Sequence, residues 1–208
     1  MRRSLAMLFP LLALLAMLPL PRAFASDAKP YFLVAAPEMR DPIFRQSVIM
    51  MVPTIEAPLL AGVIINEPTG TSAEEVFPHF PALKHDPTSA YYGGPIDNGR
   101  PTIALRTAHP PAKAVQIFDD VYVSTDADTI ALILKERPPA NIRIFLGRAQ
   151  WLEDQLQSEL MREAWYIVPP DPELVFNADP THLWRKLVAR GQLQETRFIL
   201  PIAGGLAQ

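Results

Sequence analysis

Residues 31–52 read YFLVAAPEMRDPIFRQSVIMMV, and this stretch decides the fold. Two apolar runs, Tyr31–Ala36 and Ser47–Val52, flank a polar segment that contains two prolines. A third run of the same kind, Ala61–Asn66, follows. Short apolar runs that are bounded by turn-forming residues are typical of strands buried on both faces of a sheet. We therefore expect the first half of the domain to be built on buried strands.

The rest of the chain shows both strand and helix patterns. Strands are expected over residues 90–92, 102–106, 116–124, 141–146 and 164–168, and helices over residues 126–137, 150–161 and 180–191. The second helix is predicted from leucines spaced four residues apart, and the third from the cap Asp179-Pro180 and the stop signal Gly191. Strand patterns come first along the chain, and strand and helix patterns alternate afterwards, which predicts a single α+β domain. Residues 192–208 are expected to form a flexible tail.

Residues 1–25 have the pattern of an export signal. Two arginines precede an apolar run over residues 5–20, and Ala23-Phe24-Ala25 forms a small-x-small cleavage site. The apolar run contains prolines and is shorter than the roughly 20 residues that span a bilayer, which argues against a retained anchor. We expect cleavage before Ser26, a domain over residues 26–191, and a periplasmic or secreted protein with no stable membrane span.

The composition excludes several classes of protein. The 208 residues include no cysteine, so disulfides, thiolate zinc sites and a cysteine nucleophile are excluded. Cleavage after residue 25 would remove three arginines and no acid, which leaves 183 residues with 16 Lys and Arg against 22 Asp and Glu, a formal charge of −6. Affinity for nucleic acid depends on basic residues that neutralise phosphates. We therefore expect no nucleic-acid partner.

The polar residues match no common catalytic motif: the sequence has no nucleophile elbow, Walker loop, dinucleotide fingerprint or zincin helix. His79, His85 and Asp86 share a proline-rich segment and are a candidate set of metal ligands. Their spacing fits no established ligand pattern, so a polar loop is the simpler interpretation. Asp119 and Asp120 fall inside a predicted strand, where successive side chains point to opposite faces. We expect neither a metal nor another cofactor.

Gly93 and Gly94 follow a short predicted strand and form a second candidate site. A glycine pair lets a ligand approach the backbone closely, and Arg100 is placed to supply positive charge. Pro95 removes a backbone donor that an anion site would use. The alternative is a tight corner of the chain that holds no ligand.

Taken in order, these segments resemble the YqgE/AlgH family. Residues 31–52 are similar to its FL-A-P-x-M-x-DP-x-F-x-x-SV pattern, residues 62–68 to GLVIN-x-P, and residues 92–96 to GGPV. The resemblance continues through Trp151, Gln155, Leu156, Glu159 and Trp165, and covers about residues 30 to 190.

The resemblance implies a compact α+β fold with bulged, coiled strands that approach a barrel, and three to four peripheral helices. It implies no established activity, cofactor or catalytic residue. In two places this sequence departs from the family pattern: Gly99 replaces the aspartate before Arg100, and inner glycines are missing from the segment Gly147–Leu156. If those glycines line a pocket in relatives, the pocket here is narrower or takes a different partner.

The leading hypothesis is a non-catalytic exported domain that binds a small molecule or an envelope protein. Polar and glycine positions at strand ends are expected to converge on one surface made of Pro37, Arg40, Asp41, Pro42, Asn66, Gly93, Gly94, Arg100 and Trp151. One alternative is an envelope hydrolase or a metal-dependent enzyme. Others are a structural interaction protein and a regulatory protein of the kind suggested for the family.

Overall fold

The two apolar runs of residues 31–52 form neighbouring strands in the middle of the molecule. β1 (Phe32–Ala35) pairs antiparallel with β2 (Val48–Val52), with Leu33 opposite Ile49. Every residue of β1 is buried, so the strand is covered on both faces as the sequence predicts. The structure is a computed structural model and describes residues 30–54, 58–136 and 141–199.

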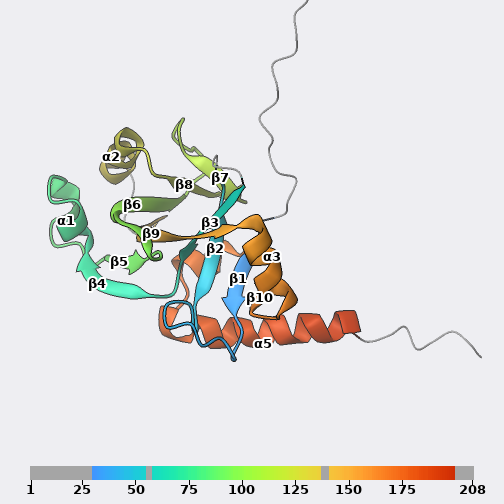
Figure 1. The fold of residues 1–208 in the computed structure, drawn as a ribbon. Helices are drawn as coiled ribbons and strands as arrows, with labels where there is room; N and C mark the ends of the chain where they lie inside the picture. The colour runs from blue at the N-terminus through green and yellow to red at the C-terminus, as the bar shows by residue number, and fades with distance from the viewer. Residues whose placement is uncertain (1–29, 55–57, 137–140, 200–208) are drawn as a thin grey trace, which may run out of the picture.

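The ten strands of the described residues form one curled sheet (Figure 1). The strands after β1 and β2 are β3 (Leu59–Ile64), β4 (Pro68–Ser72), β5 (Ser89–Tyr92), β6 (Ile96–Arg106), β7 (Val115–Phe118), β8 (Val121–Ser124), β9 (Ile142–Leu152) and β10 (Trp165–Val168). Their order is β10-β1-β2-β3-β9-β6-β8-β7, with each neighbouring pair antiparallel. β5 pairs in parallel with β9 and carries β4, so the sheet is mixed, as expected.

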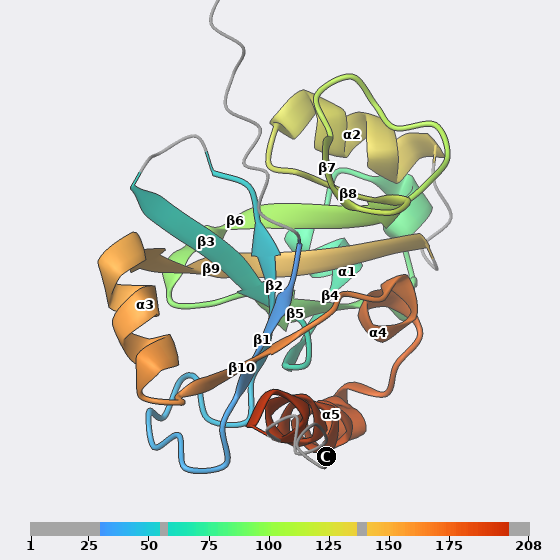
Figure 2. The same cartoon turned by 90° about the vertical axis from the view of Figure 1, so that its right-hand side faces the viewer.

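Helices cover both faces of this sheet (Figure 2). They are α1 (Ala73–Val76), α2 (Ala127–Glu136), α3 (Glu153–Met161), α4 (Pro172–Phe176) and α5 (Pro180–Ile199), together with the 3-10 helix η1 (Pro81–Leu83). The described chain thus has five α-helices where three to four were expected, and two of the five span only four and five residues. None of the helices in this part of the chain is long and apolar enough to span a membrane.

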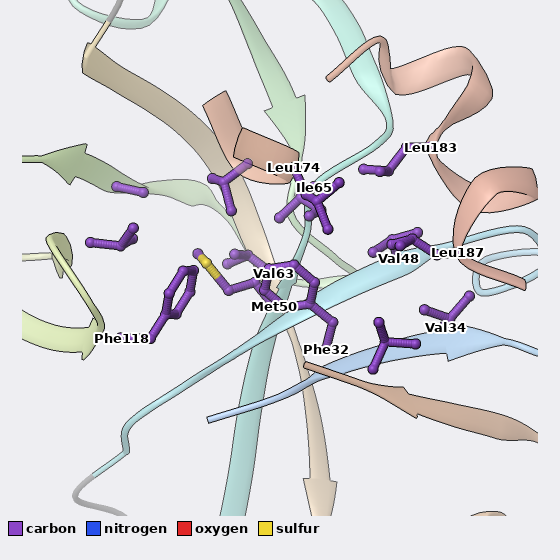
Figure 3. Close-up of a cluster of buried hydrophobic side chains, with 14 of the residues drawn as sticks. Phe32, Val34, Val48, Met50, Val63, Ile65, Phe118, Leu174, Leu183 and Leu187 are labelled. Atoms are coloured by element: carbon purple, nitrogen blue, oxygen red, sulfur yellow. The ribbon is translucent and has the colours of Figure 1, made fainter. Parts of the chain in front are cut away.

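Alternate residues of the central strands pack into two separate layers. The inner layer contains Phe32, Val48 and Met50 of the sheet together with Leu183 and Leu187 of α5, and Val48 lies beside Leu187 (Figure 3). The outer layer holds the strand residues that alternate with those of the inner layer, together with residues of other elements that pack on the same side. Its members are Leu33, Ala35, Ile49, Ile64, Ala149, Trp151, Leu156 and Trp165. Because both layers are covered, each central strand buries both of its faces.

The sheet curls until two distant strands touch. The rings of Phe32 in β1 and Phe118 in β7 pack edge to face, with their centroids 5.8 Å apart (Figure 3). β7 is the strand at one end of the order and β1 is next to the other end. The contact therefore bends the sheet around its inner layer into a half-barrel, which confirms the expected barrel-like form.

The prediction of a single strand over residues 116–124 is wrong. β7 and β8 form a hairpin instead, and Asp119 and Asp120 form its turn. Asp119 has a φ of 43°, in the left-handed region that aspartate tolerates better than most side chains. The two carboxylates therefore lie in a turn rather than on opposite faces of a strand, and Asp120 pairs with Arg106 of β6.

The helix predicted from residue 150 begins three residues later. β9 continues to Leu152, with Trp151 opposite Leu60 and Leu152 opposite Leu59 in β3. Leu152 fits the four-residue spacing of the leucines, but it is 54% exposed, whereas Leu156 is 2% exposed. The spacing is correct for α3, but the pairing with β3 determines where the strand stops.

The last helix does not end at Gly191, as predicted, because α5 continues to Ile199. A Cβ atom at Gly191 would lie 2.7 Å from Cβ and Cγ of Tyr166 in β10. The glycine therefore permits close packing of α5 on the sheet and does not act as a stop signal. Of the predicted flexible tail, residues 200–208 lie outside the described residues, as do all residues of the predicted export signal.

The sequence prediction missed β4, α1 and α4. α1 begins with a capping box in which Ser72 and Glu75 satisfy each other's backbone groups. α4 begins with the cap Asp171, followed by a first-turn proline. Both signals can be read in the sequence, but helices of four and five residues are too short to show an apolar period.

Asp179 caps α5 and provides a test by pH titration. Its carboxylate accepts hydrogen bonds from the Thr181 hydroxyl (2.7 Å) and the Thr181 backbone (2.9 Å), and it lies 2.7 Å from His182 Nδ1. The Thr181 hydroxyl is the largest cause, and together these contacts lower the pKa of Asp179 from 3.8 to about 2. Since the folded-state pKa is lowered, the stabilisation is complete above about pH 4 and is lost as the pH falls towards 2.

We expect a carboxyl-carbon NMR titration of the folded protein to give a pKa of about 2 for Asp179. Thr181→Val removes the hydroxyl but keeps the backbone donor, so the pKa should rise towards its ordinary value. A value near 3.8 in the unmodified protein would contradict this capping arrangement.

Candidate functional site

A cleft of about 360 Å³ is lined by residues of β2, β3, β6, β7, β8 and β9 and of the adjoining loops. We call it the barrel-mouth cleft. Its apolar wall consists of small aliphatic side chains: Val52, Ala61, Val63, Val115 and Val123. Its polar lining includes Asp97, Arg100, Thr102, Lys113, Asp126 and Arg148. Pockets for small molecules typically have volumes of about 300–1,000 Å³ and mainly apolar walls with a few polar groups. This cleft has a suitable volume and an aliphatic wall, but its lining is richer in polar residues than that of a typical pocket.

Strand alternation explains why these residues face the cleft. Ala104 and Val123, which pair across β6 and β8, both belong to the inner layer. Side chains two residues apart on a strand share a face, so Thr102 lies on the same side as Ala104, and Arg100 is the next residue towards the rim. The polar end of the cleft is therefore a continuation of the inner face of β6.

Two of the three cations in the cleft are neutralised by neighbouring acids. Arg148 Nη1 lies 2.8 Å from Asp97 Oδ2, and Lys113 Nζ lies 3.0 Å from Asp126 Oδ2. The hydrogen bond between Lys113 and Asp126 raises the pKa of the lysine and lowers that of the aspartate, so both groups are charged at neutral pH. Arg100 forms no ion pair or hydrogen bond with any residue in the described ranges. Counted over the described lining residues, three cations stand against two aspartates, a net charge of +1, while Asp128 outside the lining also acts on Lys113.

The hydroxyl of Thr102 also lacks a partner. Thr102 is only 8% exposed, lines the cleft, and makes no side-chain hydrogen bond within residues 30–54, 58–136 and 141–199. Among the described residues, the fully buried side-chain polar atom that lacks a partner is Arg143 Nε, so the Thr102 hydroxyl oxygen is accessible from the cleft. This hydroxyl is available to a bound molecule.

The surface predicted from the sequence does not form as one unit. Arg100 lines the barrel-mouth cleft, but Trp151 is 2% exposed and belongs to the outer layer, on the opposite face of β9 from Arg148. The segment from Pro37 to Pro42 lies with the outer layer as well, since Met39 packs there. These strands are buried on both faces, as predicted, so polar residues near the same strand end can face opposite layers, and the expectation of one shared surface did not take this into account.

Asp41 and Asn66 have structural roles. Asp41 Oδ1 accepts hydrogen bonds from the backbone N–H groups of Ile43 (2.8 Å) and Phe44 (3.1 Å) and so holds a turn. Asn66 accepts from the Val48 backbone (2.7 Å) and donates to the Gln46 carbonyl (2.9 Å), which ties the end of β3 to the start of β2. Arg40, next to the turn, is exposed and has no partner among the described residues.

Phe44, placed by the turn at Asp41, completes an aromatic cluster. Its ring centroid lies 5.8 Å from that of Trp151 and 5.9 Å from that of Trp165. Both indole N–H groups donate to one oxygen, Glu159 Oε2, at 3.1 and 2.8 Å. Sequence positions that carried the family resemblance therefore form a packing unit under α3 rather than a ligand contact.

Backbone occupies the space next to Gly93 and Gly94. Gly93 N–H donates to the Leu146 carbonyl (2.7 Å), and the Gly93 carbonyl accepts from Ile64 N–H (3.0 Å). A Cβ atom on either glycine would overlap backbone atoms of residues 146–149. The alternative reading, a tight corner without a ligand, is the one that this geometry supports.

His79, His85 and Asp86 do not come together as a metal site. No group of three metal-ligating side chains occurs in the described parts of the chain. Both histidines are exposed, and Asp86 Oδ1 accepts from the Thr88 backbone N–H at 2.8 Å. The polar loop is therefore the better interpretation of this segment.

The sequence analysis did not single out Thr102, Lys113 or Arg148, which line the cleft. Of these three residues, only Thr102 has a local signal in the sequence, which is the alternation of Arg100, Thr102 and Ala104 along one face of a strand. The lining has neither histidine nor cysteine, and each of its two carboxylates pairs with a cation.

Comparison with known proteins confirms the family resemblance. The model of the AlgH-like family, DUF179, matches residues 32–195. A UPF0301 protein of Vibrio parahaemolyticus is 30% identical over 168 residues, which cover 77% of this chain and 89% of the relative. A UPF0301 protein of Idiomarina loihiensis is 29% identical over 165 residues, 75% of this chain and 86% of the relative.

Two solved structures have the same fold. The solution structure of the AlgH protein from Pseudomonas aeruginosa has a TM-score of 0.64 at 27% identity, and the match covers 90% of this chain and all of that one. The crystal structure of protein DIP2367 from Corynebacterium diphtheriae has a TM-score of 0.66 at 21% identity, with 85% and 88% covered. Since the family match also spans most of the sequence, the chain belongs to the AlgH-like family.

Proposed function

We propose that this protein is a non-catalytic binding protein that takes a small molecule into the barrel-mouth cleft. The observation that supports this most directly is a pair of polar groups with no protein partner among the described residues, the exposed Arg100 guanidinium and the accessible Thr102 hydroxyl, beside an aliphatic wall. A bound molecule would accept hydrogen bonds from both groups in place of water and would remove the apolar wall from water. An envelope protein that inserts a side chain there is the second candidate.

Methyl NMR spectroscopy of the purified protein tests the proposal. Val63, Val115 and Val123 place methyl groups on the wall of the cleft. We expect members of a fragment set with neutral, anionic and cationic compounds to shift these signals, while the methyl signals of the outer layer stay unchanged. If no fragment of any class moves the cleft signals, small-molecule binding in the cleft is disproved.

Two matched variants show whether binding takes place in the cleft. Val115→Trp fills part of the cleft from the edge strand β7, where Val115 is 50% exposed, and should abolish the shifts. Ile167→Trp introduces the same ring on the edge strand β10, where Ile167 is 49% exposed and far from the lining residues in sequence. The control should bind as the unmodified protein does. Equal loss of binding in both variants would contradict a site in the cleft.

We further propose that the binding domain is exported, with residues 1–25 as the signal. The support is the charged start, the short apolar run and the small-x-small site in the sequence. Cell fractionation followed by intact mass measurement should find a chain that begins at Ser26 outside the cytoplasm. A cytoplasmic chain that retains residues 1–25 would contradict export.

A further inference from the structure

The charges of the barrel-mouth cleft restrict its ligand. Arg148 and Lys113 are each paired with an aspartate, so Arg100 leaves the lining with one net positive charge. A monoanion balances that charge. A dianion, such as a phosphate monoester, would leave one negative charge beside Asp97 and Asp126 in a partly enclosed space, where like charges repel strongly.

The Arg100 guanidinium and the Thr102 hydroxyl, which have no protein partner among the described residues, match the donors that a carboxylate requires. A guanidinium presents N–H groups in a fork that fits the two carboxylate oxygens, and a threonine hydroxyl adds one further donor. Arg100 and Thr102 stand on the same face of β6, about 7 Å apart along the strand, which is within reach of a flexible arginine side chain. One carboxylate can therefore accept from both residues.

The wall of the cleft favours an aliphatic body. Its apolar side chains come from valine and alanine, and the lining includes no aromatic residue on which a base or a ring could stack. Thr102 is the innermost polar group on β6, followed along that strand by the buried Ile103 and Ala104. Val63 and Val123 are as deeply buried as Thr102, whereas Val115 is 50% exposed, so the aliphatic surface extends from beside Thr102 to the opening of the cleft.

From this arrangement, and resting on the proposed binding function, we infer that the cleft takes a small aliphatic monocarboxylate. The carboxylate lies between Arg100 and Thr102, and the alkyl chain packs against Val63, Val115 and Val123. Each additional methylene group that the cleft accommodates should tighten binding about fourfold, which corresponds to burial of about 0.8 kcal/mol per methylene.

Isothermal titration calorimetry with butanoate, hexanoate, 1-hexanol and hexyl phosphate tests this inference on the purified protein. We expect hexanoate to bind roughly sixteenfold more tightly than butanoate and at least tenfold more tightly than 1-hexanol. Arg100→Gln should weaken hexanoate about tenfold and leave 1-hexanol unchanged, and Thr102→Val should weaken hexanoate to a smaller extent. Arg40→Gln removes an equally exposed and unpaired arginine outside the cleft and should have no effect.

The outcomes separate this inference from the proposed function. If 1-hexanol binds as tightly as hexanoate, or if hexyl phosphate binds more tightly, the monocarboxylate is wrong while binding in the cleft stands. If only cationic fragments shift the cleft methyl signals, the monocarboxylate is also wrong while binding in the cleft stands. If neither the calorimetry nor the methyl signals respond to any compound, the proposed function itself fails.

Discussion

Gly147→Ala is expected to destabilise the folded protein by about 4 kcal/mol. Gly147 has a φ of 76°, and a Cβ atom there would overlap the Gly94 carbonyl and Asn98 Oδ1 and would lie 2.9 Å from the Ile96 carbonyl. A side chain in the left-handed region costs about 1–3 kcal/mol, and overpacking adds about 1–3 kcal/mol. The nearest carbonyls are backbone atoms that cannot rotate away. Urea denaturation followed by circular dichroism measures the loss.

Gly70→Ala is the matched control for this prediction. Gly70 has nearly the same φ, 78°, but no atom lies within 4 Å of a Cβ placed there. The control therefore carries only the backbone cost, about 1–2 kcal/mol. If the two variants lose equal stability, the close backbone crossing of Gly147 and Gly94 is not the cause.

Glu159→Ala is expected to cost about 3 kcal/mol, because it leaves the indole N–H groups of two buried tryptophans without an acceptor. Each unpaired donor of this kind costs about 1–3 kcal/mol. The loss should appear in denaturation followed by tryptophan fluorescence, since Trp151 and Trp165 both report on this cluster. The aromatic contacts with Phe44 should also loosen, which would expose the turn at Asp41 to faster hydrogen exchange.

Glu159→Gln tests whether the acceptor or the charge is needed. A single oxygen, Oε2, accepts from both indoles, so a glutamine with its carbonyl oxygen in that position retains both hydrogen bonds. Its amide group would replace Oε1, where Gln155 is able to turn its own amide and accept. We expect a loss below about 1 kcal/mol. A loss as large as that of the alanine variant would show that the carboxylate charge stabilises the cluster.

The candidate site illustrates what could be predicted. Arg100 was identified because a charged residue follows a glycine-rich turn, and the structure does place it in the cleft. Its importance, however, depends on Asp97 pairing with Arg148 from a strand about 50 residues away, which leaves Arg100 as the unpaired cation. Thr102 was missed because a threonine in an apolar strand is common, and only the curl of the sheet turns its hydroxyl towards a cleft.

Local pattern was sufficient for the core strands and for the family. The runs that became β1, β2 and β3 are apolar throughout because both faces are covered, and this requirement is visible within six residues. The ordered motifs from residue 31 onward led to the AlgH-like family, which the comparisons confirm. Because strand and helix patterns are local features of the sequence, the α+β class could also be predicted before any strand pairing was known.

Tertiary structure alone decided the boundaries and the faces. Pairing of β9 with β3 extends the strand to Leu152 against a helical leucine spacing, and contact with Tyr166 explains a glycine inside α5 that otherwise resembles a stop signal. The tertiary structure also separates Trp151, in the outer layer, from Arg100, at the cleft, although the sequence predicts both on one surface. The physical reason is the same in each case: strand pairing and packing join residues far apart in the chain, and their free energy outweighs local preference.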